Sequence, residues 1–198
     1  MQHDIYATLG ASNHSNEERE ANDYYATDPR ALELLMEEYA DELNLSRRIW
    51  EPAAGEGHLA EVLRKRGRTV CATDIIERGY KLDDVVDFFS INSRMYCDIV
   101  TNPPYSIAKE FVEHALDIVD EGRKVLMFLR LLFLESKKRK ELFEKYPPRA
   151  IYVSSSRLQC AKGGNFDKYA NGTGTAIAYA WFLWEKGYSG DTVVRWFN

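Results

Sequence analysis

The sequence predicts an α/β fold in which helices cover both faces of a mostly parallel central β-sheet. Short apolar segments alternate along the chain with amphipathic helical patterns, and this alternation is typical of βαβ units. The segment 124–131 is a continuous apolar run around Arg130, as expected of a central parallel strand that is covered on both faces. Two other strands end abruptly, one at a glycine turn and one at a proline pair. Ligands bind at such strand ends in open sheets of this kind.

The length and composition indicate one folded domain. The chain has 198 residues, of which 45% are hydrophobic. This length and composition suffice for one well-buried core but are too small for two stable domains. Residues 1–23 are polar and lack a sustained apolar period, so we expect an N-terminal arm there and a single domain over 24–198. The net charge of −5 argues against a generally basic surface, although a local patch can still bind phosphate.

The cysteines and the hydropathy pattern predict the cellular compartment of the protein. Cys71, Cys97 and Cys160 are odd in number and show no C-x-x-C spacing, so neither a disulfide framework nor a metal site is indicated. The chain has no basic start followed by an apolar core, and no apolar run approaches the ~20 residues that span a bilayer. We therefore expect a soluble, cytoplasmic protein with no membrane partner.

The first half of the domain predicts a helix followed by a βαβ unit. Apolar residues fall on one helical stripe after Pro29, and Asp28 is placed to cap that helix. In chain order the expected elements are this helix, a strand over 48–50, a glycine turn over 51–57, a helix that ends at Gly67, a strand over 69–75 and a short strand or turn over 85–89.

The second half predicts further strands and two more helices. Apolar spacing indicates a helix over 108–119 and another, with a basic face, over 133–146. The expected strands cover 98–101, 124–131, 150–153, 176–184 and 192–197, and a long loop over 154–175 separates the third of them from the fourth.

The strand over 98–101 stops at the sequence Asn-Pro-Pro-Tyr. Pro103 and Pro104 remove two backbone donors and prevent the strand from continuing. Asn102 and Tyr105 therefore project from the carboxyl end of the sheet, and Arg130 ends its own strand at the same edge.

The glycine turn satisfies a loose G-x-G-x-x-G/A pattern beginning at Gly55, and Asp74 follows at about the ~20-residue distance of a ribose-binding acid. A dinucleotide would bring a pyrophosphate to this turn, where Glu51 would repel it. Glu51 instead favours a ligand with cationic groups, such as the ammonium and sulfonium of S-adenosylmethionine.

Three segments carry a family resemblance. The segment 51–57 (Glu-Pro-Ala-Ala-Gly-Glu-Gly) resembles the cofactor motif of class I S-adenosylmethionine-dependent methyltransferases, and Asn-Pro-Pro-Tyr resembles the catalytic motif of their N6-adenine branch. The segment 24–29 resembles an aromatic-x-Thr-Pro segment of adenine DNA methyltransferases, with Asp28 where a proline is usual. Over residues 24–184 the chain is similar to small phage-type and prophage-type enzymes of this family.

The resemblance implies a Rossmann-like sheet with an antiparallel C-terminal strand, S-adenosyl-L-methionine as cofactor and DNA as partner. It implies that Asp87 accepts from the cofactor's adenine amine while Phe88 packs on that ring. The implied cofactor-binding residues are Tyr25, Thr27, Glu51, Pro52, Ala53, Gly55, Gly57, Asp74, Ile75, Asp87, Phe88 and Asn102. The implied catalytic residues are Asn102, Pro103, Pro104 and Tyr105.

The chemistry can be argued from these residues. The lone pair of an exocyclic aromatic amine is delocalised into the ring, so a catalyst must favour the pyramidal geometry that frees it. The Asn102 side-chain oxygen and the Pro103 carbonyl can each accept one N–H of the amine. Tyr105 offers a flat face worth ~1–3 kcal/mol of stacking to a base that has been flipped out of a duplex.

The substrate is less sharply defined than the chemistry. RNA adenine or a protein glutamine amide would suit the same motif, and a non-catalytic cofactor- or DNA-binding module would keep the same fold. After Tyr105 there is no room for a separate recognition domain, so we expect DNA recognition from loops or from a homodimer. The candidate DNA contacts are Arg130, Arg157, Lys162 and Lys168.

Overall fold

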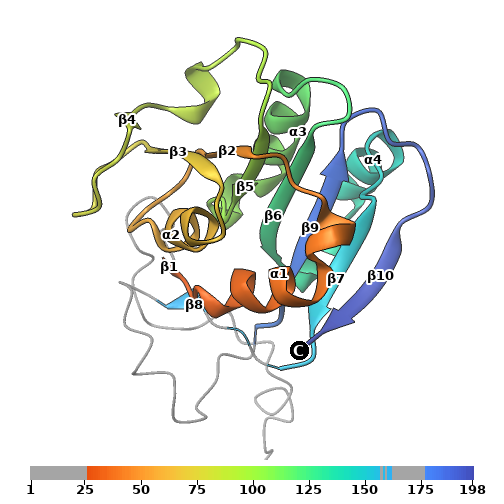
Figure 1. Cartoon of the computed structure of the whole chain (residues 1–198). Helices are drawn as coiled ribbons and strands as arrows, with labels where there is room; N and C mark the ends of the chain where they lie inside the picture. Colours follow the sequence, from red (N-terminus) through yellow and green to blue (C-terminus); the bar gives the residue numbers. More distant parts are fainter. Residues whose placement is uncertain (1–25, 157, 159, 162–176) are drawn as a thin grey trace, which may run out of the picture.

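The computed structural model describes residues 26–156, 158, 160–161 and 177–198 (Figure 1). Its main feature is an eight-stranded sheet with the order β10-β7-β9-β6-β5-β2-β3-β4. The strands are β2 (Arg48–Glu51), β3 (Thr69–Asp74), β4 (Asp84–Val85), β5 (Asp98–Thr101), β6 (Lys124–Arg130), β7 (Ala150–Ser154), β9 (Tyr179–Glu185) and β10 (Val193–Phe197). The α-helices are α1 (Arg30–Leu43), α2 (His58–Lys65), α3 (Ala108–Ile118) and α4 (Lys137–Lys145).

Strand direction confirms the predicted fold class. All neighbouring strands of the sheet run parallel except β9, which is antiparallel to both β6 and β7. The last strand, β10, returns to the parallel direction beside β7 at the edge of the sheet. The carboxyl ends of β2, β3, β5 and β6 therefore meet at one edge, where the sequence analysis places the site.

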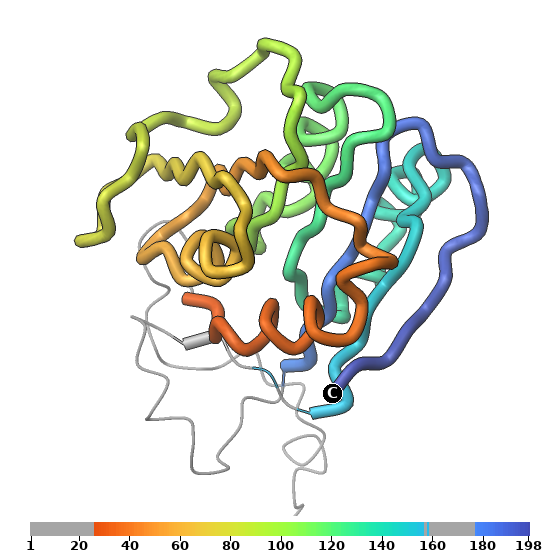
Figure 2. Tube along the Cα trace, in the orientation of Figure 1, coloured from red at the N-terminus to blue at the C-terminus, as the bar shows by residue number. Residues whose placement is uncertain are grey.

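Helices cover both faces of the sheet (Figures 1 and 2). Side chains alternate along β6, so that Leu126 and Phe128 pack in one buried cluster with residues of α1 and α2. Val125 and Met127 pack in a second cluster with residues of α3 and α4. This two-sided burial explains why the β6 sequence is a continuous apolar run rather than an alternating one. Among the described residues, no helix has the length and apolar character needed to cross a membrane.

The predicted helix over 133–146 is wrong at its start. Residues Leu131–Leu134 form a short 3-10 helix, η5, and α4 begins only at Lys137. Ser136 has a φ of 154°, which no α-helix allows, and its side chain accepts a hydrogen bond from the Arg139 N–H at 3.3 Å. The hydroxyl thus caps a new helix where the apolar pattern alone suggests continuity.

Three smaller features refine the sequence expectations. The helix after Pro29 begins at Arg30, and the Asp28 carboxylate accepts from the Arg30 N–H at 3.0 Å. The segment 85–89 contains both predicted possibilities, the end of β4 and the start of the 3-10 helix η3 (Phe88–Ser90). The predicted loop contains a short strand, β8 (Cys160–Ala161), which pairs antiparallel with β1 (Ala26–Thr27).

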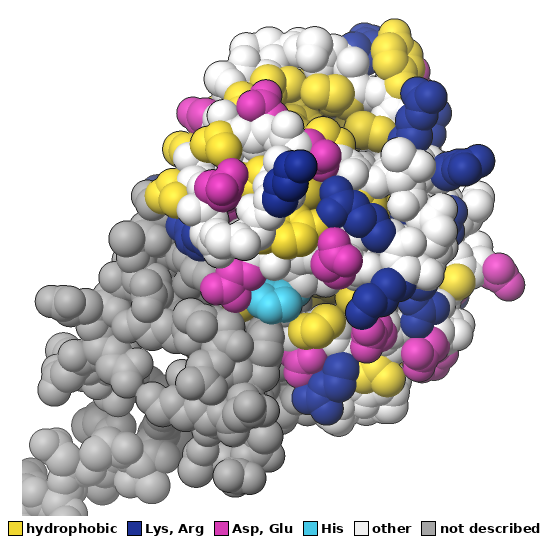
Figure 3. Space-filling view, turned by 60° about the vertical axis from the view of Figure 1, so that its left-hand side comes forward, with side chains coloured by type: hydrophobic (Ala, Val, Ile, Leu, Met, Phe, Trp, Pro, Cys, Tyr) yellow, Lys and Arg dark blue, Asp and Glu magenta, His cyan; other side chains and the backbone are white. Residues whose placement is uncertain are grey.

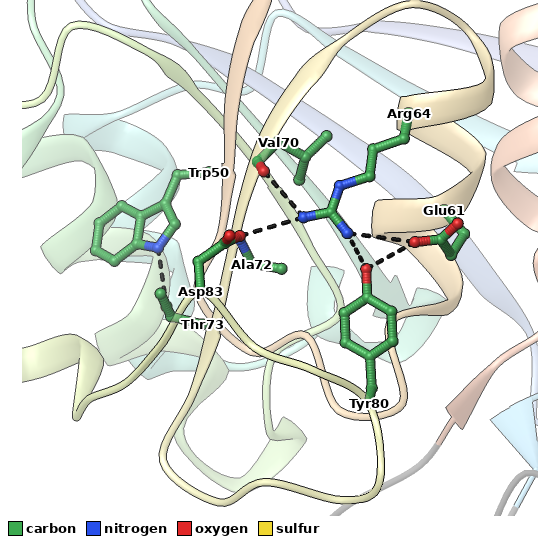
Figure 4. A network of polar contacts seen from close by, with 8 residues as sticks. All are labelled: Trp50, Glu61, Arg64, Val70, Ala72, Thr73, Tyr80 and Asp83. Atoms are coloured by element: carbon green, nitrogen blue, oxygen red, sulfur yellow. Dashed lines mark hydrogen bonds and ion pairs between the residues drawn. The ribbon is translucent and has the colours of Figure 1, made fainter.

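A polar network lies around α2, the helix that follows the glycine turn (Figure 4). The Tyr80 hydroxyl donates to Glu61 Oε1 at 2.8 Å and accepts from Arg64. Arg64 also donates to the Val70 carbonyl at 3.1 Å and to the Asp83 carboxylate at 3.2 Å. Burial raises the pKa of Tyr80 to about 12, so its hydroxyl keeps the proton that it donates. The network holds α2, β3 and the segment before β4 together.

The Tyr80 ring lies directly against Gly57, the N-cap of α2. Gly57 has a φ of +76°, and a Cβ atom added there would overlap the Tyr80 ring. Gly67 has a similar φ of +78° but no atom near the same position. An alanine at either position would strain the backbone, but only an alanine at Gly57 would also overlap a neighbouring side chain.

We predict that Gly57→Ala lowers the free energy of unfolding by about 2 kcal/mol more than Gly67→Ala, because only the first adds an overlap to the backbone strain. Denaturant titration of both variants measures the difference. Equal losses would mean that the Tyr80 ring moves aside without cost.

Candidate functional site

A cavity of about 440 Å³ lies at the carboxyl edge of the sheet, among the turns that follow β2, β3 and β5. The structure brings most of the predicted site residues to its wall: Thr27, Glu51, Pro52, Ala53, Asp74, Ile75, Asp87, Phe88, Asn102 and Pro104. Gly55, Gly57, Pro103 and Tyr105 belong to the same turns but are not part of the lining. Tyr25, Arg157, Lys162 and Lys168 lie outside the described residues.

Glu51 is the most unusual group in the cavity wall. It ends β2 with 1% of its surface exposed, and its Oε2 atom has no hydrogen-bond partner among the described residues. Burial raises its pKa well above the ordinary value, whereas a hydrogen bond from the Ala60 backbone and the charge of Arg64 act in the opposite direction. Asp74 adds to the increase.

This environment makes Glu51 a fitting partner for a cationic ligand group. A buried carboxylate with an unsatisfied oxygen is costly unless a hydrogen-bonded cation compensates it. The ammonium of S-adenosylmethionine is such a cation, so the lining residues fit the cofactor that the sequence predicts. A phosphate at the same place would meet an acid and would raise the cost further.

Asp74 anchors the glycine turn as well as facing the cavity. Its carboxylate accepts from the Gly55 N–H at 2.8 Å and from the Ile76 N–H at 3.0 Å. Arg78 also donates to it at 3.1 Å. The sequence analysis does not single out Arg78, although it lines the cavity, because its role depends on the path of the chain after β3. The ribose contact of Asp74 remains a prediction.

Asp87 and Phe88 close another side of the cavity. The Asp87 carboxylate accepts from the Phe89 N–H at 3.0 Å and so caps η3. The Phe88 ring is 4% exposed and stacks on Phe111, with the ring centroids 4.1 Å apart. One face of Phe88 is therefore occupied by the core, and a ligand ring can reach only its remaining surface. The adenine contacts of this pair remain predictions.

Asn102 meets Thr27 across the cavity wall. The Asn102 side-chain Nδ2 donates to the Thr27 hydroxyl at 2.8 Å, and both residues line the cavity. Thr27 is 4% exposed and belongs to β1, which is held by its pairing with β8. Because the amide nitrogen faces Thr27, the amide oxygen points to the other side. The sequence analysis places both residues at the site but does not predict this contact.

Tyr105 lies beside the cavity and packs against two side chains of the same edge. The Arg130 guanidinium lies over its ring at 4.7 Å from the centroid, and the Tyr179 ring is 5.8 Å away between centroids. The prediction that Arg130 and Tyr105 share one sheet edge is therefore confirmed. Arg130 Nε is buried without a hydrogen-bond partner among the described residues.

Charge is mixed on the face shown in Figure 3. Acidic and basic side chains of the described residues are interspersed there, and no extended area of one sign is seen. This face therefore offers a nucleic acid local charged groups rather than a broad basic surface.

Comparisons with known proteins bear on the fold. Neither a family model nor a curated protein matches the chain by sequence. Among solved structures, the type IIG restriction endonuclease BpuSI has a TM-score of 0.59 and 15% identity, covering 89% of this chain and 26% of that chain. Ribosomal protein L11 methylase from Lactobacillus delbrueckii subsp. bulgaricus has a TM-score of 0.54 and 12% identity, covering 83% of this chain and 82% of that chain.

A predicted O-methyltransferase from Agrobacterium tumefaciens also has a TM-score of 0.54, with 13% identity over 75% of this chain and 78% of that chain. At such low identity these similarities establish the architecture and leave the substrate open. The chain has the Rossmann-like α/β fold that these two methyltransferases share.

Proposed function

We propose that the chain is an S-adenosylmethionine-dependent methyltransferase that acts on N6 of adenine in DNA. The observation that carries this proposal is the composition of one cavity wall. It combines the buried, partly unsatisfied Glu51 carboxylate with Asn102 of the Asn-Pro-Pro-Tyr corner. The first suits a cationic methyl donor and the second suits a planar amine, so donor and acceptor can meet in one place.

Each wall of the cavity has a role in holding the cofactor. Glu51 would bind the ammonium, Asp74 the ribose hydroxyls, and Asp87 with Phe88 the adenine, while Tyr25 and Thr27 would cover it. Pro52, Ala53, Gly55, Gly57 and Ile75 would shape the turns around it. When bound, the cofactor would supply an electrophilic methyl group on its sulfonium.

The catalytic corner would activate the target amine by hydrogen bonding. The Asn102 oxygen and the Pro103 carbonyl would accept its two N–H groups and turn its lone pair toward the methyl group. Pro104 stiffens the corner, and Tyr105 would stack on the base. Thr27 contributes by holding the amide nitrogen, which fixes the orientation of the Asn102 oxygen. Once methylated, the amine loses a proton to solvent.

Two observations support a nucleic-acid substrate. The Arg130 guanidinium lies over the Tyr105 ring and so places a cation beside the residue on which a base would stack. BpuSI, one of the solved structures with this fold, is a restriction endonuclease. Arg157, Lys162 and Lys168 would add DNA contacts, and a homodimer would enlarge the recognition surface. RNA adenine and a protein glutamine amide are the alternative substrates.

The decisive experiment is incubation with radiolabelled S-adenosylmethionine and separate DNA, RNA and protein pools, followed by nucleoside or amino-acid analysis. We expect label in N6-methyladenine of DNA. Asn102→Ala should reduce transfer by about 100-fold or more, with calorimetric cofactor affinity nearly unchanged. Label in RNA or glutamine would assign the alternative substrate. Cofactor binding without label in any pool would indicate a non-catalytic module.

Glu51→Gln should have opposite effects on binding and stability. The folded pKa of Glu51 is raised, so the folded state binds more protons than the unfolded state above the ordinary glutamate pKa of about 4.3. Wild-type stability therefore falls as pH rises toward the folded pKa, and the variant should gain relative stability over that range. Its cofactor affinity should fall by about tenfold or more because a charged partner is lost.

Thermal unfolding without cofactor, across pH 5 to 8, and calorimetric titration measure the two effects of the Glu51 variant. Glu56→Gln is a matched control, because Glu56 lies in the same turn but outside the cavity lining. Unchanged affinity in Glu51→Gln would contradict the ammonium contact.

Thr27→Val tests the orientation of the catalytic amide. Loss of the hydroxyl should lower kcat by about tenfold, because the amide loses a hydrogen bond that orients it, while cofactor affinity changes little. Thr27→Ser keeps the hydroxyl and should restore most of kcat. If cofactor affinity falls while kcat is unchanged, Thr27 acts only by covering the cofactor and does not orient the Asn102 amide.

A further inference from the structure

Two leucines face solvent in the turn that follows β6. Leu132 is 66% exposed and Leu134 is 46% exposed, whereas Phe133 between them is 5% exposed. Leu131 packs partly against the same core cluster as Phe133. The turn therefore anchors alternate residues inward and presents the two leucines outward.

The backbone of this turn is firmly held. The Leu131 N–H donates to the Ala178 carbonyl at 2.8 Å, which ties the turn to the segment before β9. Arg139 donates to the carbonyls of Leu132 at 2.8 Å and Glu135 at 3.0 Å. Its guanidinium also lies over the Phe133 ring, 4.8 Å from the centroid. The exposure of the leucines is thus a property of an ordered turn.

The turn begins next to the catalytic corner. Arg130, the residue immediately before η5, lies over the Tyr105 ring. A substrate ring that stacks on Tyr105 would therefore have η5 beside it. The exposed leucines of η5 would therefore lie beside the part of the DNA from which the target base is extruded.

Cations follow the leucines directly. Lys137 and Lys138 are exposed, and neither forms an ion pair with any described residue. Lys140 differs, because it pairs with Glu144 at 3.4 Å, and Arg139 is occupied by the turn. Glu135 is the acid between the leucines and the lysines. The arrangement combines apolar side chains with two available positive charges.

We infer that η5 and the first turn of α4 form a contact surface for duplex DNA. Leu132 and Leu134 pack against the base pairs beside the extruded adenine, and Lys137 and Lys138 contact the flanking phosphates. Extruding a base exposes apolar faces of its neighbours, and inserted leucine side chains are a known way to cover them. This inference rests on the proposed function, and it specifies a double-stranded substrate.

The double variant Leu132→Ser/Leu134→Ser tests the two leucines. Its substrate is an oligonucleotide that contains an adenine methylated by the wild type. The oligonucleotide is supplied in three forms: as a single strand, as a matched duplex, and as a duplex with an abasic site opposite the target adenine. We expect about a tenfold loss of kcat/KM on the matched duplex and little loss on the other two, which need less unstacking. Trp196→Ser, 63% exposed on β10, is the control and should leave all three rates unchanged.

The lysines are tested by fluorescence anisotropy of duplex binding at several salt concentrations. Lys137→Ala/Lys138→Ala should reduce the slope of log K against log salt by about 1.8, the value for two lost phosphate contacts. Lys140→Ala removes a charge from the same helix but should leave the slope unchanged.

The outcomes separate this inference from the proposed function. A wild type that methylates only single-stranded DNA, equal losses on all three substrates, or equal slopes for the two sets of lysine variants would overturn the surface while leaving the methyltransferase proposal intact. A wild type that methylates no DNA would overturn both.

Discussion

The hydrogen bond from the Gly55 N–H to the Asp74 carboxylate holds the turn after β2 against the end of β3. A second bond, from the Ala54 N–H to the Thr73 carbonyl at 2.9 Å, links the same two strand ends. These two bonds satisfy the Gly55 and Ala54 N–H groups, and an unsatisfied buried donor costs about 1–3 kcal/mol. Through this connection Glu51 and Asp74 face one cavity, and the strand order β5-β2-β3 brings the turn after β5 to its other side.

The buried carboxyl group of Glu51 lowers the free energy of unfolding of the protein. An apolar side chain of similar size would remove a buried, partly unsatisfied carboxylate from the core edge. The fold tolerates the acid because the sheet is buried on both faces by two large apolar clusters. Local destabilisation of this kind is common where a protein binds a ligand of opposite charge.

Much of the architecture could be predicted from the sequence, because hydrophobic periodicity and abrupt strand ends report local structure directly. For that reason the sequence predicts that the residues of both turns lie at the same edge of the sheet. The restart of α4 at Ser136 was missed because a capping hydroxyl leaves the apolar period unchanged. The Thr27 contact with Asn102 and the position of Arg78 could not be predicted, because they depend on how distant segments pack.

The insertion of β9 between β6 and β7 has a consequence for how the chain acquires its fold. β6 and β7 follow one another in sequence but do not pair, and the space between them is filled only when 179–185 arrive. Trp181, Phe182 and Leu183 then become fully buried. During synthesis the growing sheet thus keeps two apolar strands with open edges until a late, sequence-distant strand joins them. Such edges fold slowly and invite aggregation, so the pairing of β9 with β6 and β7 is the step that removes them.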